Sequence, residues 1–281
     1  MKSILLVGQS NMAGRGFLNE VPTILNDHLK MLRNGRWQLM TEPIHFDREV
    51  AGVGPAASFA QAWSADHPGE DLGLIPCAEG GSALAEWSPD GPLMRHAISE
   101  ARFAQETSEI VAILWHQGES DSLNQQYVDY QDRLVTTLTH LRTSLALENV
   151  PLIMGTLPDF LGKSGFGQSA TEYPQINREM TAAVPRLAPA YLVSGADLTA
   201  NPDGIHINAS SQRKFGLRYY QAFHDQQSVP DSLPDEDTRV AALYDHPTTA
   251  SERQYLLSKR LVTGQITFAT FMAEFAAAQK G

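Results

Sequence analysis

Five short apolar runs, separated by stretches with helical periodicity, restrict the fold of this chain more than any other feature. The runs lie at residues 4–7, 72–77, 110–115, 151–157 and 191–194. Short continuous apolar runs are typical of strands that are buried on both faces of a parallel sheet. Because helical patterns separate them, we expect right-handed βαβ crossovers, and hence an α/β fold with a five-stranded parallel sheet of flavodoxin-like order.

The helices that we expect between these strands carry apolar residues at spacings of three and four. The first of them opens at residues 52–55 and runs through residue 67. The others lie at 92–105, 124–146, 172–187 and 208–224. Residues 17–50 have scattered Pro, Asn, Asp and Gly and no clear periodicity, so we predict a long irregular loop there. A second, Gly-rich loop is expected at 159–170. Loops of this kind often carry substrate contacts.

The carboxyl-terminal part of the chain differs in composition from the rest. We predict one catalytic domain over residues 1–225, a Pro/Asp/Ser linker over 226–238 and a helical extension over 239–281. The extension has an apolar stripe at Phe268, Phe271, Met272 and Phe275. Two short helices cannot bury such a stripe alone, so we expect packing on the main domain or a homo-oligomer formed through these helices.

Charge and cysteine content limit the partners and the compartment. Lys and Arg number 21 against 32 Asp and Glu, a formal net charge of −11, which argues against a nucleic-acid or anionic-membrane surface. The single cysteine, Cys77, cannot form an intramolecular disulfide. We find no signal-peptide pattern and no apolar run of about 18 residues. We therefore expect a cytoplasmic protein, or a secreted one if a leader is removed from it.

Polar clusters follow four of the five predicted strands. Ser10 follows the first, Gly80 and Gly81 the second, residues 116–121 the third and residues 203–206 the fifth. The carboxyl ends of parallel strands share one edge of the sheet, where ligands bind in open α/β folds. We therefore expect these clusters to converge on one site.

Three of these residues suit nucleophilic acyl transfer. Ser10 is the candidate nucleophile, and His206 is the candidate base because an imidazole titrates near pH ~6.5 and can carry a proton both ways. Asp203 lies three residues before His206, so on a turn its carboxylate can reach back to the ring. Each residue alone also fits an ordinary turn or cap, so the prediction depends on all three together.

An oxyanion needs hydrogen-bond donors, and three are available at these strand ends. They are the main-chain N–H groups of Ser10 and Gly81 and the side-chain amide of Gln117. Glu119 and Asp121 also fit acids at a helix start.

No His or Cys spacing typical of zinc and no phosphate-binding glycine motif is present, so we expect no metal and no cofactor.

The successive clusters resemble the blocks of SGNH-type hydrolases. They are 8–14 (GQSNMAG), 80–82 (GGS) with 86–87 (EW), 116–121 (HQGESD) and 203–206 (DGIH). The similarity is closest to the sialate O-acetylesterase-like branch, which includes the acetylxylan esterases of carbohydrate esterase family 6. It spans about residues 3–224. Gln117 stands where the wider superfamily has asparagine, which matches this branch and disfavours a lipase-like member.

The resemblance implies a three-layer α/β/α sandwich and metal-free hydrolysis of O-acetyl groups on sugars. It assigns the nucleophile to Ser10, the base to His206 and the oxyanion donors to Ser10, Gly81 and Gln117. Asp203 is the favoured partner of His206. Glu119 is the alternative, because a glutamate in the third block can serve in carbohydrate esterases of this kind.

The sequence thus predicts a serine esterase that deacetylates a carbohydrate of the acetylxylan or O-acetylated sialic acid type. Gln9, Asn11 and Trp87 are the residues that we expect to contact this substrate. Two alternatives remain: a general short-chain carboxylesterase or thioesterase, and a non-catalytic carbohydrate-binding relative. The complete set of nucleophile, base and acid argues against the last.

Overall fold

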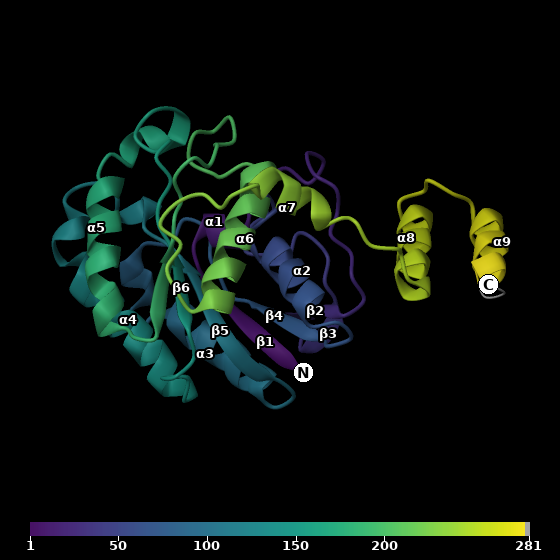
Figure 1. The fold of residues 1–281 in the computed structure, drawn as a ribbon, viewed down its shortest axis with the longest axis horizontal. Helices are drawn as coiled ribbons and strands as arrows, with labels where there is room; N and C mark the ends of the chain where they lie inside the picture. The colour runs from purple at the N-terminus through teal and green to yellow at the C-terminus, as the bar shows by residue number, and fades with distance from the viewer. Residues whose placement is uncertain (279–281) are drawn as a thin grey trace.

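A seven-stranded sheet lies at the centre of the computed structural model, which describes residues 1–278 (Figure 1). Its strands are β1 (Lys2–Gly8), β2 (Leu29–Arg33), β3 (Arg36–Leu39), β4 (Leu72–Pro76), β5 (Glu109–His116), β6 (Leu152–Gly155) and β7 (Ala190–Val193). Their order in the sheet is β3-β2-β4-β1-β5-β6-β7. The pairing is parallel throughout except between β2 and β3.

The five predicted strands are all present, as β1, β4, β5, β6 and β7. Taken by themselves they have the order β4-β1-β5-β6-β7, which is the flavodoxin-like order expected from the sequence. Residues 4–7 of β1 have no exposed surface, as the continuous apolar run predicts for a central strand.

The sheet has two more strands than predicted, and both lie in the segment that we expected to be irregular. β2 pairs parallel with β4, and β3 folds back on β2 as a hairpin. The turn is Asn34–Gly35, whose φ angles of 51° and 68° are those of a two-residue hairpin turn. This Asn-Gly pair was the local signal for the hairpin. The prediction of a long loop over 17–50 is wrong for this part.

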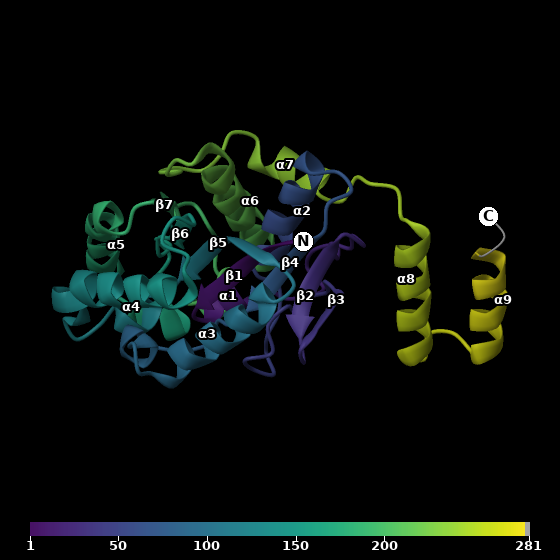
Figure 2. The ribbon, with the colours of Figure 1, turned by 90° about the horizontal axis from the view of Figure 1, so that it is seen from below.

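Helices cover both faces of the sheet, which gives the three layers (Figures 1 and 2). The helices are α1 (Ser10–Ala13), α2 (Ala56–Asp66), α3 (Pro92–Gln105), α4 (Tyr130–Leu145), α5 (Tyr173–Ala183), α6 (Ala209–Asp225), α7 (Glu236–Ala242), α8 (Ala250–Val262) and α9 (Phe268–Ala278). Short 3₁₀ turns lie at Leu84–Trp87, Glu119–Asp121, Gln126–Asp129, Gly165–Ser169 and Val184–Arg186. The side chains of β1 point alternately into two hydrophobic cores. One core lies against α2 and α6, and the other lies against α3, α4 and α5.

The segment predicted as a linker is partly built into the domain. Val229 exchanges main-chain hydrogen bonds of 2.8 Å with Leu192 and Ser194 at the end of β7. α7 begins within the segment, and its Glu236 forms a buried ion pair with Arg218 of α6, Oε1 to Nε 2.6 Å. The chain therefore stays on the core up to the end of α7.

α8 and α9 form a helical hairpin that projects from the body of the molecule (Figures 1 and 2). α8 is attached at its start, where Glu252 accepts the main-chain N–H of Asp27 at 3.0 Å and Thr249 donates to the Asp27 carboxylate at 2.8 Å. α9 packs on α8, and its Phe268 and Met272 remain 66% and 46% exposed. Within residues 1–278, no helix is both long and apolar enough to cross a membrane.

Candidate active site

The predicted nucleophile lies where β1 ends. Ser10 is the first residue of α1 and is 4% exposed. The chain can turn there because Gly8 has a φ of 127° and because a Cβ on it would lie 2.1 Å from the main-chain oxygen of His116 on β5. Glycine thus lets β1 and β5 approach closely at the point where Ser10 leaves the sheet.

His206 and Asp203 are held together on the loop that follows β7. The ring Nδ1 of His206 lies 2.8 Å from one oxygen of Asp203. The other oxygen accepts the main-chain N–H groups of Ile205 at 3.1 Å and His206 at 3.0 Å. Burial alone would raise the pKa of Asp203, but the hydrogen bonds from His206 and Ile205 outweigh it and hold the pKa below its usual value. A charged Asp203 therefore accepts the Nδ1 proton and leaves Nε2 free to act as a base.

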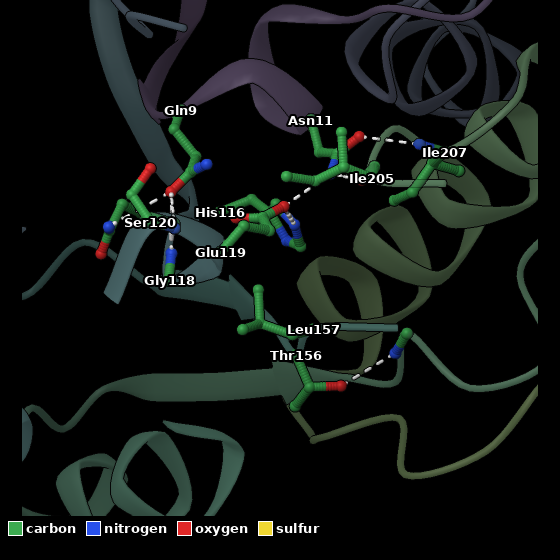
Figure 3. Close-up of polar contacts among 12 residues, drawn as sticks. Gln9, Asn11, His116, Gly118, Glu119, Ser120, Thr156, Leu157, Ile205 and Ile207 are labelled. Atoms are coloured by element: carbon green, nitrogen blue, oxygen red, sulfur yellow. Dashed lines mark hydrogen bonds and ion pairs between the residues drawn. The ribbon is translucent and has the colours of Figure 1, made fainter. Parts of the chain in front are cut away.

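Asn11, the neighbour of Ser10, connects the nucleophile to the His206 loop. Its Oδ1 accepts the N–H of Ile207 at 2.9 Å, and its Nδ2 donates to the carbonyl of Ile205 at 3.2 Å (Figure 3). The residues on both sides of His206 are thus fixed by one side chain. Within residues 1–278, no hydrogen bond joins Ser10 itself to His206. Such contacts are often long in unliganded enzymes and shorten when substrate binds.

Glu119 forms hydrogen bonds with Asn11 and His116 and does not contact His206. Its Oε1 accepts Nδ2 of Asn11 at 2.5 Å and lies 3.0 Å from Nε2 of His116 (Figure 3). Burial raises the pKa of Glu119, but the charge and hydrogen bond of His116 and the amide of Asn11 lower it by more. Of the two carboxylates that the sequence left open, the structure brings Asp203 to His206, whereas Glu119 orients Asn11.

In the described residues, the glycine turn after β4 presents one free main-chain donor, the N–H of Gly81. Gly81 has a φ of 79°, and the position where a Cβ would be is open. Its neighbour Gly80 donates its N–H to Asp47 at 2.8 Å, and Asp47 is paired with the buried guanidinium of Arg15 at 2.5 Å. In the part of the chain that the structure describes, the N–H groups of Ser10 and Gly81 have no acceptor. Both N–H groups are therefore free to donate to an oxyanion.

Gln117 lies deeper than predicted. Its side chain is fully buried, and its Nε2 donates to Asp121 at 2.6 Å, to Gln9 at 3.2 Å and to the carbonyl of Ser82 at 3.3 Å. In the structure this amide is occupied by protein acceptors, and its role as an oxyanion donor stays a prediction. Two of the acceptors, Gln9 and Ser82, come from other loops, so sequence spacing could not indicate them. Through these hydrogen bonds Gln117 holds Gln9 and the glycine turn in position.

Burial contradicts two of the three predicted substrate contacts, Trp87 and Asn11, and the third, Gln9, stays a prediction. Trp87 has no exposed surface, since its Nε1 donates to Ser82 at 2.9 Å and its ring packs edge-to-face on Trp115 with centroids 5.5 Å apart. Asn11 is also fully buried. Gln9 is 2% exposed, and its Oε1 accepts the N–H of Gly118 at 3.1 Å.

A cavity beside His206 is lined by residues that no sequence motif marks. Phe17, Leu18 and Val50 come from the first predicted loop and Phe166 from the second. The loops were expected to contact substrate, but no pattern within them marked these positions. Within residues 1–278, no group of three or more His, Cys, Asp or Glu side chains could hold a metal ion.

Comparison with known proteins places this chain in a family. The model of the family described as "Carbohydrate esterase, sialic acid-specific acetylesterase" matches residues 1–225. A probable carbohydrate esterase from Arabidopsis thaliana is 30% identical over 250 residues, which are 78% of this chain and 88% of the plant protein. An X-ray structure of an Arabidopsis thaliana protein is similar at a TM-score of 0.72 and 27% identity, with 80% and 98% of the two chains covered.

Two further solved structures share the fold at lower identity. NanS is 16% identical with a TM-score of 0.65, and the match covers 80% of this chain and 96% of NanS. A carbohydrate acetylesterase from Xanthomonas citri is 17% identical with a TM-score of 0.59, and the match covers 79% of this chain and 55% of that protein. At these identities the similarity supports the α/β architecture.

Proposed function

Because the chain belongs to the carbohydrate esterase, sialic acid-specific acetylesterase family, we propose that Ser10, His206 and Asp203 remove O-acetyl groups from a carbohydrate. The protein is a carboxylic ester hydrolase. The observation that carries the residue assignment is the Asp203–His206 pair, which Asn11 fastens beside Ser10.

The first half of the reaction transfers the acetyl group to the protein. Ser10 Oγ attacks the ester carbonyl carbon while His206 Nε2 takes the hydroxyl proton. The charged Asp203 stabilises the imidazolium that forms. The N–H groups of Ser10 and Gly81 donate to the oxyanion. The protein needs no rearrangement for this, because neither N–H group has another acceptor within residues 1–278. When the intermediate collapses, His206 returns the proton to the departing sugar oxygen.

The second half regenerates Ser10. A water molecule attacks the acetyl-serine carbonyl while His206 Nε2 takes one of its protons. The same two N–H groups stabilise the second oxyanion. Ser10 then leaves and recovers its proton from His206, and acetate is released.

Replacing the nucleophile tests the assignment. Ser10→Ala is expected to reduce acetate release from an acetylated glycan by at least ~10⁴-fold, because a triad without its nucleophile keeps little activity. Ser99→Ala is the control and should keep normal activity, since Ser99 is exposed on α3 and none of the catalytic residues lies on that helix. Near-normal acetate release by Ser10→Ala, with an unchanged melting temperature, would contradict the mechanism.

We also propose that α8 and α9 join two copies of the chain. The exposed Phe268 and Met272 lie on a hairpin that projects from the domain, and apolar faces of this kind are costly to leave in water.

A further inference from the structure

A cavity of about 590 Å³ opens beside His206. Its walls come from the segment after α1, from the loop before α2 and from the loop after β6. Its lining includes the side chains of Phe17, Leu18, Val50, Phe166 and His206 itself. This cavity is where loops distant in sequence meet the catalytic base.

The direction of proton transfer decides which part of the substrate enters this cavity. In the proposed reaction His206 returns its proton to the departing oxygen of the sugar. That oxygen must therefore lie within hydrogen-bond reach of the His206 ring. The rest of the leaving alcohol then extends from the ring into the adjoining cavity, while the acetyl carbonyl oxygen points to Ser10 and Gly81.

The walls of the cavity are largely apolar and face solvent. Phe17 and Leu18 are each 47% exposed, Val50 is 72% exposed and Phe166 is 76% exposed. Large apolar side chains that gather around a cavity mark a binding surface. A pyranose ring presents C–H groups on one face, and such a face packs well on aromatic and aliphatic side chains.

The charges around the cavity do not suit an anionic sugar. Arg15 contributes to the wall, but its side chain is 5% exposed and its guanidinium is already paired with Asp47 at 2.5 Å. Asp203 adds a negative charge beside His206. Among residues 1–278, no other Lys or Arg lines this cavity. The carboxylate of a sialic acid would therefore lose water there without gaining a free cation.

We propose that this cavity binds the leaving sugar through Phe17, Leu18, Val50 and Phe166, and that the sugar is a neutral O-acetylated pyranose and not an O-acetylated sialic acid. The inference rests on the proposed function, because it takes His206 as the group that protonates the leaving alcohol. It assigns the choice of substrate to two loops that share no motif with the catalytic blocks.

The first test compares substrates of the wild-type protein. Acetate release is measured with acetylated xylo-oligosaccharides, with 9-O-acetyl-N-acetylneuraminic acid and with ethyl acetate, which has no ring. We expect kcat/KM for the neutral glycan to exceed that for the sialic acid ester by about tenfold or more, since one unpaired charged group costs at least that much. A higher kcat/KM for the sialic acid ester would overturn the proposal.

The second test changes the apolar walls. Phe17→Ala and Phe166→Ala are each expected to lower the ratio of kcat/KM for the neutral glycan to that for ethyl acetate by about three- to tenfold. Most of the change should be in KM for the glycan. Phe103→Ala is the control, because Phe103 is 44% exposed on α3 and lies outside this cavity, so the ratio should not change. An unchanged ratio in both wall variants would overturn the proposal.

The third test adds the missing cation. Val50→Arg is compared with Val50→Gln, which has a long polar side chain without charge, and Val50 is exposed enough to accept both. We expect Val50→Arg to raise kcat/KM for the sialic acid ester about threefold or more over Val50→Gln. Equal values would contradict the role given to charge.

If Ser10→Ala hydrolyses ethyl acetate as fast as the wild type, the proposed function itself fails, and the inference fails with it.

Discussion

Asp203 holds His206 twice, through Nδ1 of the ring at 2.8 Å and through the main-chain N–H at 3.0 Å. The two contacts use different oxygens of one carboxylate, so the ring is fixed relative to its own backbone. The low pKa of Asp203 keeps the carboxylate charged and able to stabilise a protonated ring.

Asp203→Asn should therefore be among the most damaging single changes outside Ser10. We expect kcat for acetate release to fall by roughly 10⁴-fold, by analogy with the aspartate of serine proteases, because the amide favours the wrong ring tautomer. KM should change little. The measurement is steady-state kinetics on an acetylated glycan, together with a melting curve that shows the variant is folded.

Glu119→Gln should cost much less, because Glu119 reaches the His206 loop only through Asn11. A loss of about 10–100-fold in kcat is expected, as for other substitutions of residues that orient a ligating or catalytic side chain through a hydrogen bond. The pH profile of kcat/KM should keep its shape in Glu119→Gln and lose it in Asp203→Asn. A nearly inactive Glu119→Gln beside an active Asp203→Asn would show that the two roles are exchanged.

The pH dependence of stability should reveal the Arg218–Glu236 ion pair. Burial raises the pKa of Glu236, but the hydrogen bonds from Arg218 and the N–H of Leu233 lower it by more. A carboxylate with a lowered pKa in the folded state stabilises the fold above its unfolded pKa of about 4.3, and the effect is lost as pH falls through the folded value.

Glu236→Gln should consequently lower the free energy of unfolding by about 3 kcal/mol at pH 7, since it leaves Arg218 buried without its partner charge. The difference from the wild type should shrink below pH ~4. Urea unfolding at several pH values is the measurement, and Asp231→Asn, at an exposed position nearby, is the control. A difference that does not depend on pH would show that the ion pair does not titrate with unfolding.

Acyl chain length should discriminate strongly at the Ser10 side of the site. Ser10 is 4% exposed and lies against buried side chains, while the open cavity lies on the side of the leaving alcohol. We expect p-nitrophenyl acetate to be hydrolysed at least about 100-fold faster than the octanoate ester. Equal rates would favour a lipase-like esterase.

Removal of the projecting hairpin tests its role in assembly. Truncation after Asp245 keeps α7 on the core and deletes α8 and α9. If the hairpin joins two copies, light scattering should show the full chain at twice the mass of one copy and the truncated chain as a single copy. A full chain that is already monomeric, with an unchanged melting curve after truncation, would show that the hairpin has no such role.

Local sequence patterns were sufficient for the frame of the domain. Each central strand is an apolar run, and parallel strands bring their carboxyl ends to one edge whatever the details of packing. The Asp203–His206 contact was also predictable, because three residues on a turn separate its partners. The β2–β3 hairpin had a local signal as well in Asn34–Gly35, although the alternation on its strands is weak.

The sequence by itself therefore determined the five-strand order, the meeting of the catalytic blocks and the pairing of His206 with a nearby acid. Only the tertiary structure decided the burial of Trp87 and Gln117, the place of Glu119 behind Asn11 and the cavity beside His206. The physical reason is the range of the contacts. A turn or a strand depends on neighbours in the chain, whereas the surroundings of a side chain come from loops a hundred or more residues apart, as with Asn11 and Glu119.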